Sequence, residues 1–122
     1  MSTRILVVED DDVNLMIAEH ILQKEGFDVT TVNNGEEAIS IVEEEKFDMI
    51  LMDIEMPIMD GLEATPIIRA KDNGKNIPII ALTAHHMPEK LEEFRKAGMD
   101  GHIIKPIDMP KFKAVFEKFF AV

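Results

Sequence analysis

The stretch Ile5-Leu6-Val7-Val8-Glu9-Asp10 decides the fold of this chain, because an uninterrupted apolar run ends directly in two carboxylates. An apolar run without polar alternation is typical of a strand that is covered on both faces, as in a parallel sheet. The shorter and more polar segment Val29–Val32 suits an edge strand. Three further apolar runs complete a prediction of five strands, at Met49–Met52, Ile79–Leu82 and His102–Ile104.

Each of these runs is followed by a segment with helical spacing. In Val13–Glu25 the apolar residues recur every three or four positions, which predicts a helix that buries them. The predicted alternation of strand and helix is typical of an α/β protein, so we expect an open, doubly wound, five-stranded parallel sheet. One domain is expected over residues 1–122, with its core between about residues 4 and 120. The apolar residues of the first helix are Val13, Met16, Ile17, Ile21 and Leu22.

Composition and charge narrow the classes of function. The chain has 122 residues and no cysteine, which excludes disulfides, thiolate metal sites and cysteine nucleophiles. Its 24 acidic and 13 basic residues give a net charge of −11, so direct binding of nucleic acid is not expected. The apolar runs are too short to span a membrane, and no apolar leader opens the chain. A cytoplasmic location is therefore expected.

Polar side chains stand at the ends of four predicted strands. In an open parallel sheet, ligands bind outside the carboxyl ends of the strands, so Glu9, Asp10, Asp53, Thr83 and Lys105 are expected to converge on one rim. Two carboxylates about 5 Å apart repel each other by roughly 3 kcal/mol at an effective dielectric of about 20. Raised carboxyl pKa values, the lysine or a divalent cation could each relieve this repulsion. An all-oxygen donor set favours Mg²⁺ or Mn²⁺, and either Asp10 or Asp53 could serve as a nucleophile toward a phosphoryl group.

The motifs that carry these residues resemble the receiver domain of two-component response regulators. The resemblance runs from about Arg4 to Phe120, with 30 residues from Asp53 to Thr83 and 22 from Thr83 to Lys105. It implies a flavodoxin-like sheet with the strand order 2-1-3-4-5 between two layers of helices. The matching segments are Ile5–Asp10, Asp48–Pro57, Met59–Gly61, Pro78–Ala84 and Lys105-Pro106.

The resemblance implies a role for each polar group at the rim. Asp53 would accept a phosphoryl group from a phosphohistidine on a histidine kinase or a phosphotransfer protein. Mg²⁺, for which Mn²⁺ could substitute, would be held by Asp10, Asp53 and the backbone carbonyl of Glu55, with Glu9 contributing through water. Lys105 would contact the phosphoryl oxygens and pair with Asp53 at rest. The chain would then be a signalling module that catalyses only its own phosphorylation and dephosphorylation, rather than an enzyme.

A conformational switch is implied as well. Thr83 would turn toward the phosphoryl group and shift Ala84. The surface of the fourth helix, the fifth strand and the fifth helix would change with it, and a downstream protein would bind there. The family's usual switch residue is Tyr or Phe, and His102 stands in its place.

Three further expectations concern the loops of the site and the state of assembly. Glu55 and His85 would flank the water that hydrolyses the phosphoaspartate, and would so tune its lifetime. The Lys105-Pro106 peptide bond is expected to be cis. The protein is expected to be a monomer or a weak, phosphorylation-linked dimer.

Two other classes of function fit parts of the same pattern. A haloacid-dehalogenase-type phosphatase would use Asp10 as its nucleophile, since Asp10-Asp11-Asp12 contains an Asp-x-Asp motif, but the loop after Asp53 would have no role. A flavodoxin-like cofactor binder would need a phosphate-cradling loop where this chain has four acidic residues. Within the receiver interpretation, a stand-alone regulator and a receiver belonging to a hybrid kinase both remain open.

Overall fold

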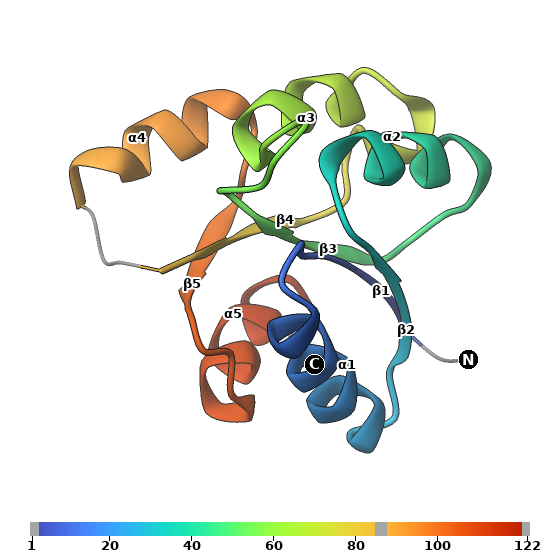
Figure 1. The fold of residues 1–122 in the computed structure, drawn as a ribbon, viewed down its shortest axis with the longest axis vertical. Helices are drawn as coiled ribbons and strands as arrows, with labels where there is room; N and C mark the ends of the chain where they lie inside the picture. Colours follow the sequence, from blue (N-terminus) through green and yellow to red (C-terminus); the bar gives the residue numbers. More distant parts are fainter. Residues whose placement is uncertain (1–2, 85–87, 121–122) are drawn as a thin grey trace.

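The computed structural model describes residues 3–84 and 88–120 as strands and helices that alternate around one sheet (Figure 1). The strands are β1 (Arg4–Val8), β2 (Asp28–Val32), β3 (Met49–Asp53), β4 (Ile79–Thr83) and β5 (Gly101–Ile104). The helices are α1 (Asp12–Lys24), α2 (Gly35–Glu44), α3 (Gly61–Arg69), α4 (Pro88–Ala97) and α5 (Met109–Phe120), with a short 3-10 helix, η1 (Asp72–Gly74), between α3 and β4. Each predicted strand is present within one residue of its expected ends.

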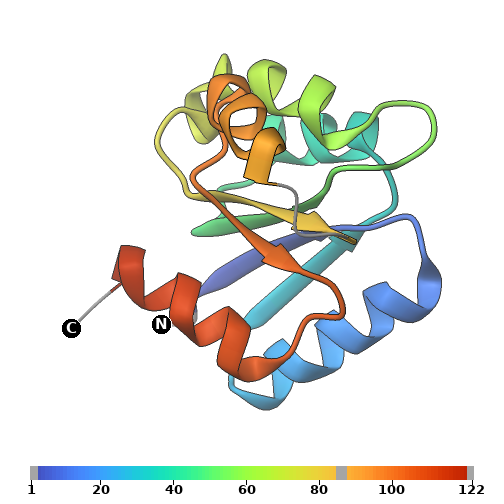
Figure 2. The ribbon, with the colours of Figure 1, turned by 90° about the vertical axis from the view of Figure 1, so that its left-hand side faces the viewer.

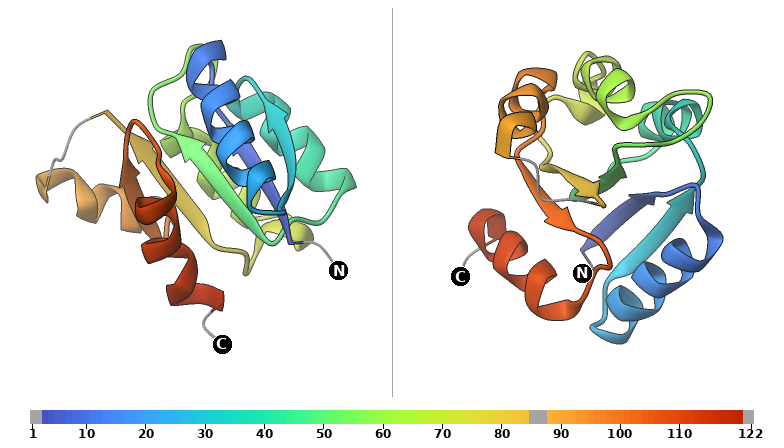
Figure 3. Two further views of the ribbon diagram at one scale, coloured as in Figure 1. Left: turned by 90° about the horizontal axis from the view of Figure 1, so that it is seen from below. Right: turned by 60° about the vertical axis from the view of Figure 1, so that its left-hand side comes forward.

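All strand pairs of the sheet are parallel, in the order β2-β1-β3-β4-β5, which confirms the predicted doubly wound topology. Every residue of β3 and β4 is buried, as expected for strands covered on both faces. β2 lies at the edge and is only half-buried, in keeping with its polar sequence. Because all the strands run the same way, their carboxyl ends lie on one edge of the sheet (Figure 3).

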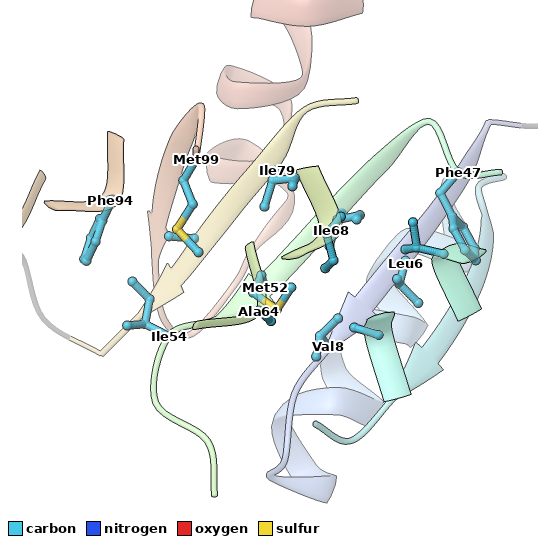
Figure 4. Packing of buried hydrophobic residues seen from close by; sticks show 14 residues of the cluster. Leu6, Val8, Phe47, Met52, Ile54, Ala64, Ile68, Ile79, Phe94 and Met99 are labelled. Atoms are coloured by element: carbon cyan, nitrogen blue, oxygen red, sulfur yellow. The ribbon is translucent and has the colours of Figure 1, made fainter. Parts of the chain in front are cut away.

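The helices form two layers, one on each face of the sheet (Figure 2). α1 and α5 cover one face, and α2, α3 and α4 cover the other. Alternate residues of each strand point into alternate layers, so that in β1 the side chains of Leu6 and Val8 pack toward α2 and α3 while Ile5 and Val7 pack toward α1 and α5. Figure 4 shows the first of these clusters, where Met52, Ala64 and Ile68 meet between β3 and α3.

Phenylalanine rings dominate the packing between α5 and the segment that precedes β2. The ring of Phe27 lies edge-on to those of Phe112 and Phe116, with centroids 5.4 and 5.1 Å apart. Phe116 also stacks on Phe120, at 4.6 Å. This phenylalanine cluster borders a groove of about 510 Å³ near the start of β2, away from the carboxyl edge of the sheet.

A glycine allows α3 to begin directly against β3. A Cβ atom at Gly61 would clash with the backbone oxygen of Asp53, because it would lie closer than any side chain can approach. The Gly61 N–H donates to the carbonyl of Ile54 at 3.0 Å, and Asp60 and Glu63 close a reciprocal capping box around the first turn of α3. The start of α3 thereby fixes the backbone of the strand end that carries Asp53.

The sequence prediction for the buried face of α1 was wrong in part. Leu22 is buried and Ile21 is half-buried as expected, but Val13 and Met16 are each 65 % exposed and Ile17 is 39 % exposed. The small residue Ala18 takes the inner position instead, so the helix is rotated away from the predicted stripe. None of the helices in the two described stretches is long and apolar enough to cross a membrane.

Candidate functional site

The predicted rim exists at the carboxyl edge of the sheet. A pocket of about 200 Å³ opens there between the ends of β1, β3, β4 and β5. Glu9 follows β1 directly, Asp53 and Thr83 end β3 and β4, and Lys105 follows β5. The pocket is lined by Glu9, Asp10, Asp11, Asn14, Asp53, Ile54, Glu55, Leu82, Thr83, Ala84 and Lys105.

The Lys105 ammonium lies between two buried carboxylates. Its Nζ atom is 3.1 Å from Asp53 Oδ2 and 3.2 Å from Glu9 Oε2. Burial alone would lower the pKa of Lys105, but the charges and hydrogen bonds of Asp53 and Glu9 outweigh it and raise that pKa. The lysine therefore stays charged at neutral pH, and its contact with Glu9 adds to the Asp53 pairing that the sequence led us to expect.

Asp53 is a carboxylate whose charged form is destabilised by its surroundings in the pocket. Only 2 % of its surface is exposed, and its pKa is raised from the ordinary 3.8 to about 7, chiefly by burial. Hydrogen bonding and charge repulsion from Glu9 contribute to this rise, and Lys105 opposes it. One oxygen, Oδ1, accepts a hydrogen bond from the Glu55 N–H at 3.1 Å. Among the buried side-chain polar atoms of the described residues, only Asp53 Oδ2 has no well-formed hydrogen bond, since Lys105 approaches it as an ion pair.

The same carboxylates fit a hard divalent cation. Oxygen atoms of Glu9, Asp10 and Asp53 all lie within 4.8 Å of one another. The side chain of Asp10 is exposed to solvent, whereas Glu9 and Asp53 are buried. An all-oxygen set beside a carboxylate oxygen that lacks a hydrogen bond is what Mg²⁺ prefers, and a cation there would relieve the repulsion that raises the pKa of Asp53.

Some of the other residues predicted for the site line this pocket, and others lie outside it. Thr83 is buried in its wall, and the exposed Ala84 lies at its mouth. His102 lies in β5 opposite Ala81, half-buried, and borders a separate pocket between α4 and β5. The Lys105-Pro106 peptide bond is cis. His85, which was expected beside the hydrolytic water, lies outside the residues that the structure describes.

The loop after Asp53 is held in an unusual backbone conformation. Ile58 has a φ angle of 71°, which β-branched residues rarely adopt, and its side chain is 71 % exposed. The Met59 N–H donates to the carbonyl of Pro57 at 2.8 Å, so the chain makes a tight γ-turn at Ile58. Nothing in the sequence signals this strain, because turns of this kind normally favour glycine or asparagine.

Sequence reasoning missed Asn14 as a residue of the site. Asn14 lies in the first turn of α1 and lines the acidic pocket, although it follows Asp10 by four positions and has no motif of its own. Asp11, by contrast, caps α1 as its position at a helix start suggests, and accepts hydrogen bonds from the N–H groups of Val13 and Asn14.

Comparison with known proteins identifies relatives along nearly the whole chain. A family model described as "Response regulator receiver domain" matches residues 5–117. The chain is 36 % identical to probable histidine kinase 1 of Oryza sativa subsp. indica over 95 % of its own length, but spans only 15 % of that kinase. It is 35 % identical to the polar-differentiation response regulator DivK of Brucella anthropi, covering 92 % of this chain and 91 % of DivK.

A solved structure shows the same fold with a metal in place. The receiver domain of sensor histidine kinase PA1611 from Pseudomonas aeruginosa, which has a magnesium ion coordinated in its active-site cleft, superposes with a TM-score of 0.90. The two sequences are 36 % identical, and the match covers all of both chains. The expectation of a haloacid-dehalogenase-type phosphatase acting through Asp10 is not supported by these relatives.

Proposed function

This chain belongs to the family of response regulator receiver domains, and from that premise we propose that Asp53 is its phosphoryl acceptor. A receiver is a signalling domain of two-component and phosphorelay systems rather than a classical enzyme. The single observation that carries the assignment is the surroundings of Asp53. This buried carboxylate at the carboxyl edge has an ammonium 3.1 Å away and two more carboxylates within 4.8 Å.

The residues divide the work of phosphoryl transfer among them. An Asp53 oxygen forms a bond to phosphorus while the bond to the donor imidazole nitrogen breaks, and the imidazole leaves with the electron pair and takes up a proton. Lys105 already lies beside Asp53, and its ammonium stabilises the negative charge that develops on one phosphoryl oxygen. The hydroxyl of Thr83 contacts another phosphoryl oxygen. Asp10, Asp53 and the carbonyl of Glu55 would hold Mg²⁺, with Glu9 through water. An ion held by these residues would neutralise phosphoryl charge.

We also propose which surface receives the donor. Asp53 lines the acidic pocket together with Asp11 and Asn14, so the start of α1 forms part of the wall through which a donor would approach. Val13 and Met16 expose apolar side chains on this helix, where the sequence predicted core. A phosphohistidine carried by a histidine kinase or phosphotransfer protein must cover this end of α1, so these side chains are suited to docking that protein.

Transmission of the signal follows from the position of Thr83. Its movement toward the phosphoryl group would shift Ala84 at the entrance to α4, and His102 on β5 would respond beside the pocket between α4 and β5. The surface of α4, β5 and α5 would then bind the downstream protein. Glu55, exposed at the rim, and His85 would set the lifetime of the phosphoaspartate. The protein would act as a monomer or a weak phosphorylation-linked dimer, without direct contact with nucleic acid.

The test is phosphorylation by a small donor. The protein is incubated with acetyl phosphate, with and without Mg²⁺, and its intact mass is followed beside the Asp53→Asn and Asp10→Asn variants. We expect a labile gain of one phosphoryl group that requires Mg²⁺ and is absent in Asp53→Asn. A phosphoryl group that survives Asp53→Asn but not Asp10→Asn would overturn the assignment. If no adduct is seen, beryllofluoride binding distinguishes two cases. A protein whose adduct is too short-lived to detect should bind beryllofluoride, and a protein that is not phosphorylated should not.

A further inference from the structure

Lys105 has more hydrogen-bonding capacity than its two carboxylates use. An ammonium carries three protons, and the Lys105 side chain is only 19 % exposed. Its Nζ atom lies 3.1 Å from Asp53 Oδ2, and 3.2 and 3.5 Å from the two oxygens of Glu9. The third proton is thus left with a long contact to the carboxylate that already accepts the second, and a better acceptor would have to come from the inner side of the lysine. Asp53 itself ceases to be a full carboxylate once it is phosphorylated.

A small cavity lies on that inner side, between α1 and the loop that follows β5. Its volume of about 10 Å³ is the space of a single water molecule. Three of its lining residues are polar, namely Glu9, Asn14 and Lys105. Its other walls are closed by Val7, Ile17, Ala18, Leu82, Pro106 and Ile107. A water held there would have three polar residues around it, which meets the usual requirement for a stably bound water.

Asn14 is the residue that joins this cavity to the acidic pocket, because it lines both. It is half-buried, and no group in the described parts of the chain forms a hydrogen bond with its carboxamide. Its backbone is fixed, since the Asn14 N–H donates to the Asp11 cap at 3.0 Å. A fixed backbone and an available amide are what a residue needs in order to hold a water in one place.

We infer that Asn14 is a positioning residue for Lys105 and acts through one water molecule in this cavity. The water accepts the third Lys105 proton and donates its own two protons to the Asn14 carbonyl oxygen and to Glu9. The lysine is then held from the side of β1 and α1, independently of Asp53, and stays aimed at the pocket while Asp53 is converted to the acyl phosphate. The effect on phosphorylation rests on the proposed function, whereas the contact between Asn14, the water and Lys105 does not.

The experiment compares Asn14→Ala with Gln23→Ala, which removes an exposed amide from the same helix. Asn14→Ala is expected to lower the rate of phosphorylation by acetyl phosphate at saturating Mg²⁺ by about tenfold, because a misplaced lysine no longer meets the phosphoryl oxygens. Mg²⁺ affinity, measured by calorimetry, should change by less than about twofold, as Asn14 is uncharged. In a Lys105→Ala background, Asn14→Ala should have no further effect on the rate.

A second readout does not depend on phosphorylation. The ¹H–¹⁵N signal of the Lys105 ammonium should exchange slowly with solvent in the unmodified protein and in Gln23→Ala, and should be lost in Asn14→Ala. Asn14→Asp, which keeps an acceptor at this position, should retain it. The inference is overturned if the signal is unaffected by Asn14→Ala, or if the rate effect persists undiminished without Lys105. If the unmodified protein is not phosphorylated at all, the proposed function fails while the ammonium signal still decides the role of Asn14.

Discussion

Each end of the sheet holds one cationic side chain against oxygen atoms, but the two ends differ in how well the partners are satisfied. At the amino end of β4 and β5, Arg69 donates to the carbonyl of Ile77 at 2.6 Å and twice to the carbonyl of Gly98, and pairs with Asp100 at 2.6 Å. At the carboxyl end, Lys105 is shared between two buried carboxylates and leaves Asp53 Oδ2 without a good hydrogen bond.

The amino end of the sheet contributes to stability, whereas the carboxyl end is arranged for reactivity. The amino end satisfies the donors of Arg69 and ties α3, η1 and the start of β5 together. The carboxyl end holds like charges close together, and a metal ion can relieve their repulsion. Proteins commonly concentrate strain of this kind where they act and compensate for it elsewhere. Substitutions at the two ends should therefore affect different measurements.

The largest effect is expected at the amino end. Arg69→Ala should lower the free energy of unfolding by about 3 kcal/mol, since it leaves Asp100 and several carbonyls without their charged partner. Mg²⁺ affinity should be unchanged in the protein that remains folded. Chemical denaturation and calorimetry measure the two quantities. Arg95→Ala is the matched control, because Arg95 is exposed and, within the described stretches, its side chain pairs only with Glu92 on its own helix. Equal losses in the two variants would remove the contrast between the ends.

A smaller effect is expected at the rim of the carboxyl end. Met16→Glu places a charge on the exposed apolar surface of α1 and should lower the rate of transfer from a phosphohistidine protein by about tenfold. Phosphorylation by acetyl phosphate, which needs no docking surface, should stay the same. Gln23→Glu adds the same charge farther along α1 and should alter neither rate. If Met16→Glu lowers the rate of phosphorylation by both donors equally, the substitution disturbs the pocket rather than docking.

The raised pKa of Asp53 should make stability depend on pH in a way that Mg²⁺ reverses. The folded chain holds a proton on the carboxyl near pH 6 that the unfolded chain has lost, because the pKa is about 7 when folded and 3.8 ordinarily. Without Mg²⁺, this stabilisation is fully present below about pH 4 and is lost as the pH rises through about 7, so the free energy of unfolding should fall over this range and level off near pH 8.

Asp53→Asn should flatten that dependence, and Mg²⁺ should stabilise the unmodified protein more at about pH 8 than at about pH 6. Denaturant titrations at several pH values, with EDTA or with Mg²⁺, measure both. A pH dependence that is the same in Asp53→Asn would assign the titration to another group.

The smallest effect concerns backbone strain in the loop after Asp53. Ile58→Gly should raise the free energy of unfolding by about 0.5 kcal/mol, since the relief at a φ angle of 71° exceeds the entropic cost of glycine. The exposed side chain loses no buried contact when it is removed. A loss of stability would show that the turn is not strained and that the isoleucine packs in solution. Thermal unfolding with Ala70→Gly as a helix-end control measures the difference.

The sequence predicted the carboxyl end better than the amino end, for a physical reason. Glu9, Asp53 and Lys105 follow apolar runs directly, so the rule for parallel sheets is enough to place all three at one edge. The order of the strands came from the family resemblance, because strand content alone does not fix it. The capping box of Asp60 and Glu63 was readable from its spacing and was overlooked.

Other features depended on packing that has no local signature. Arg69 finds its partners 29 and 31 positions away, and nothing near it in the sequence indicates them. Met16 fits a helical stripe, yet the stripe is displaced because Ala18 packs closest to the sheet. A period of 3.6 residues defines a face only to within about one position, so adjacent side chains compete for the inner side.

The phenylalanine cluster on α5 has a practical consequence for spectroscopy. The chain contains no tryptophan or tyrosine, so its intrinsic fluorescence is very weak. Phe116 lies beside Phe27 and Phe120 and borders the 510 Å³ groove, which has room for an indole. A tryptophan introduced there would be a single fluorophore on the α1–α5 layer, remote from the acidic pocket. It would give an optical signal for folding against a background free of other fluorophores, and would leave the phosphorylation chemistry undisturbed.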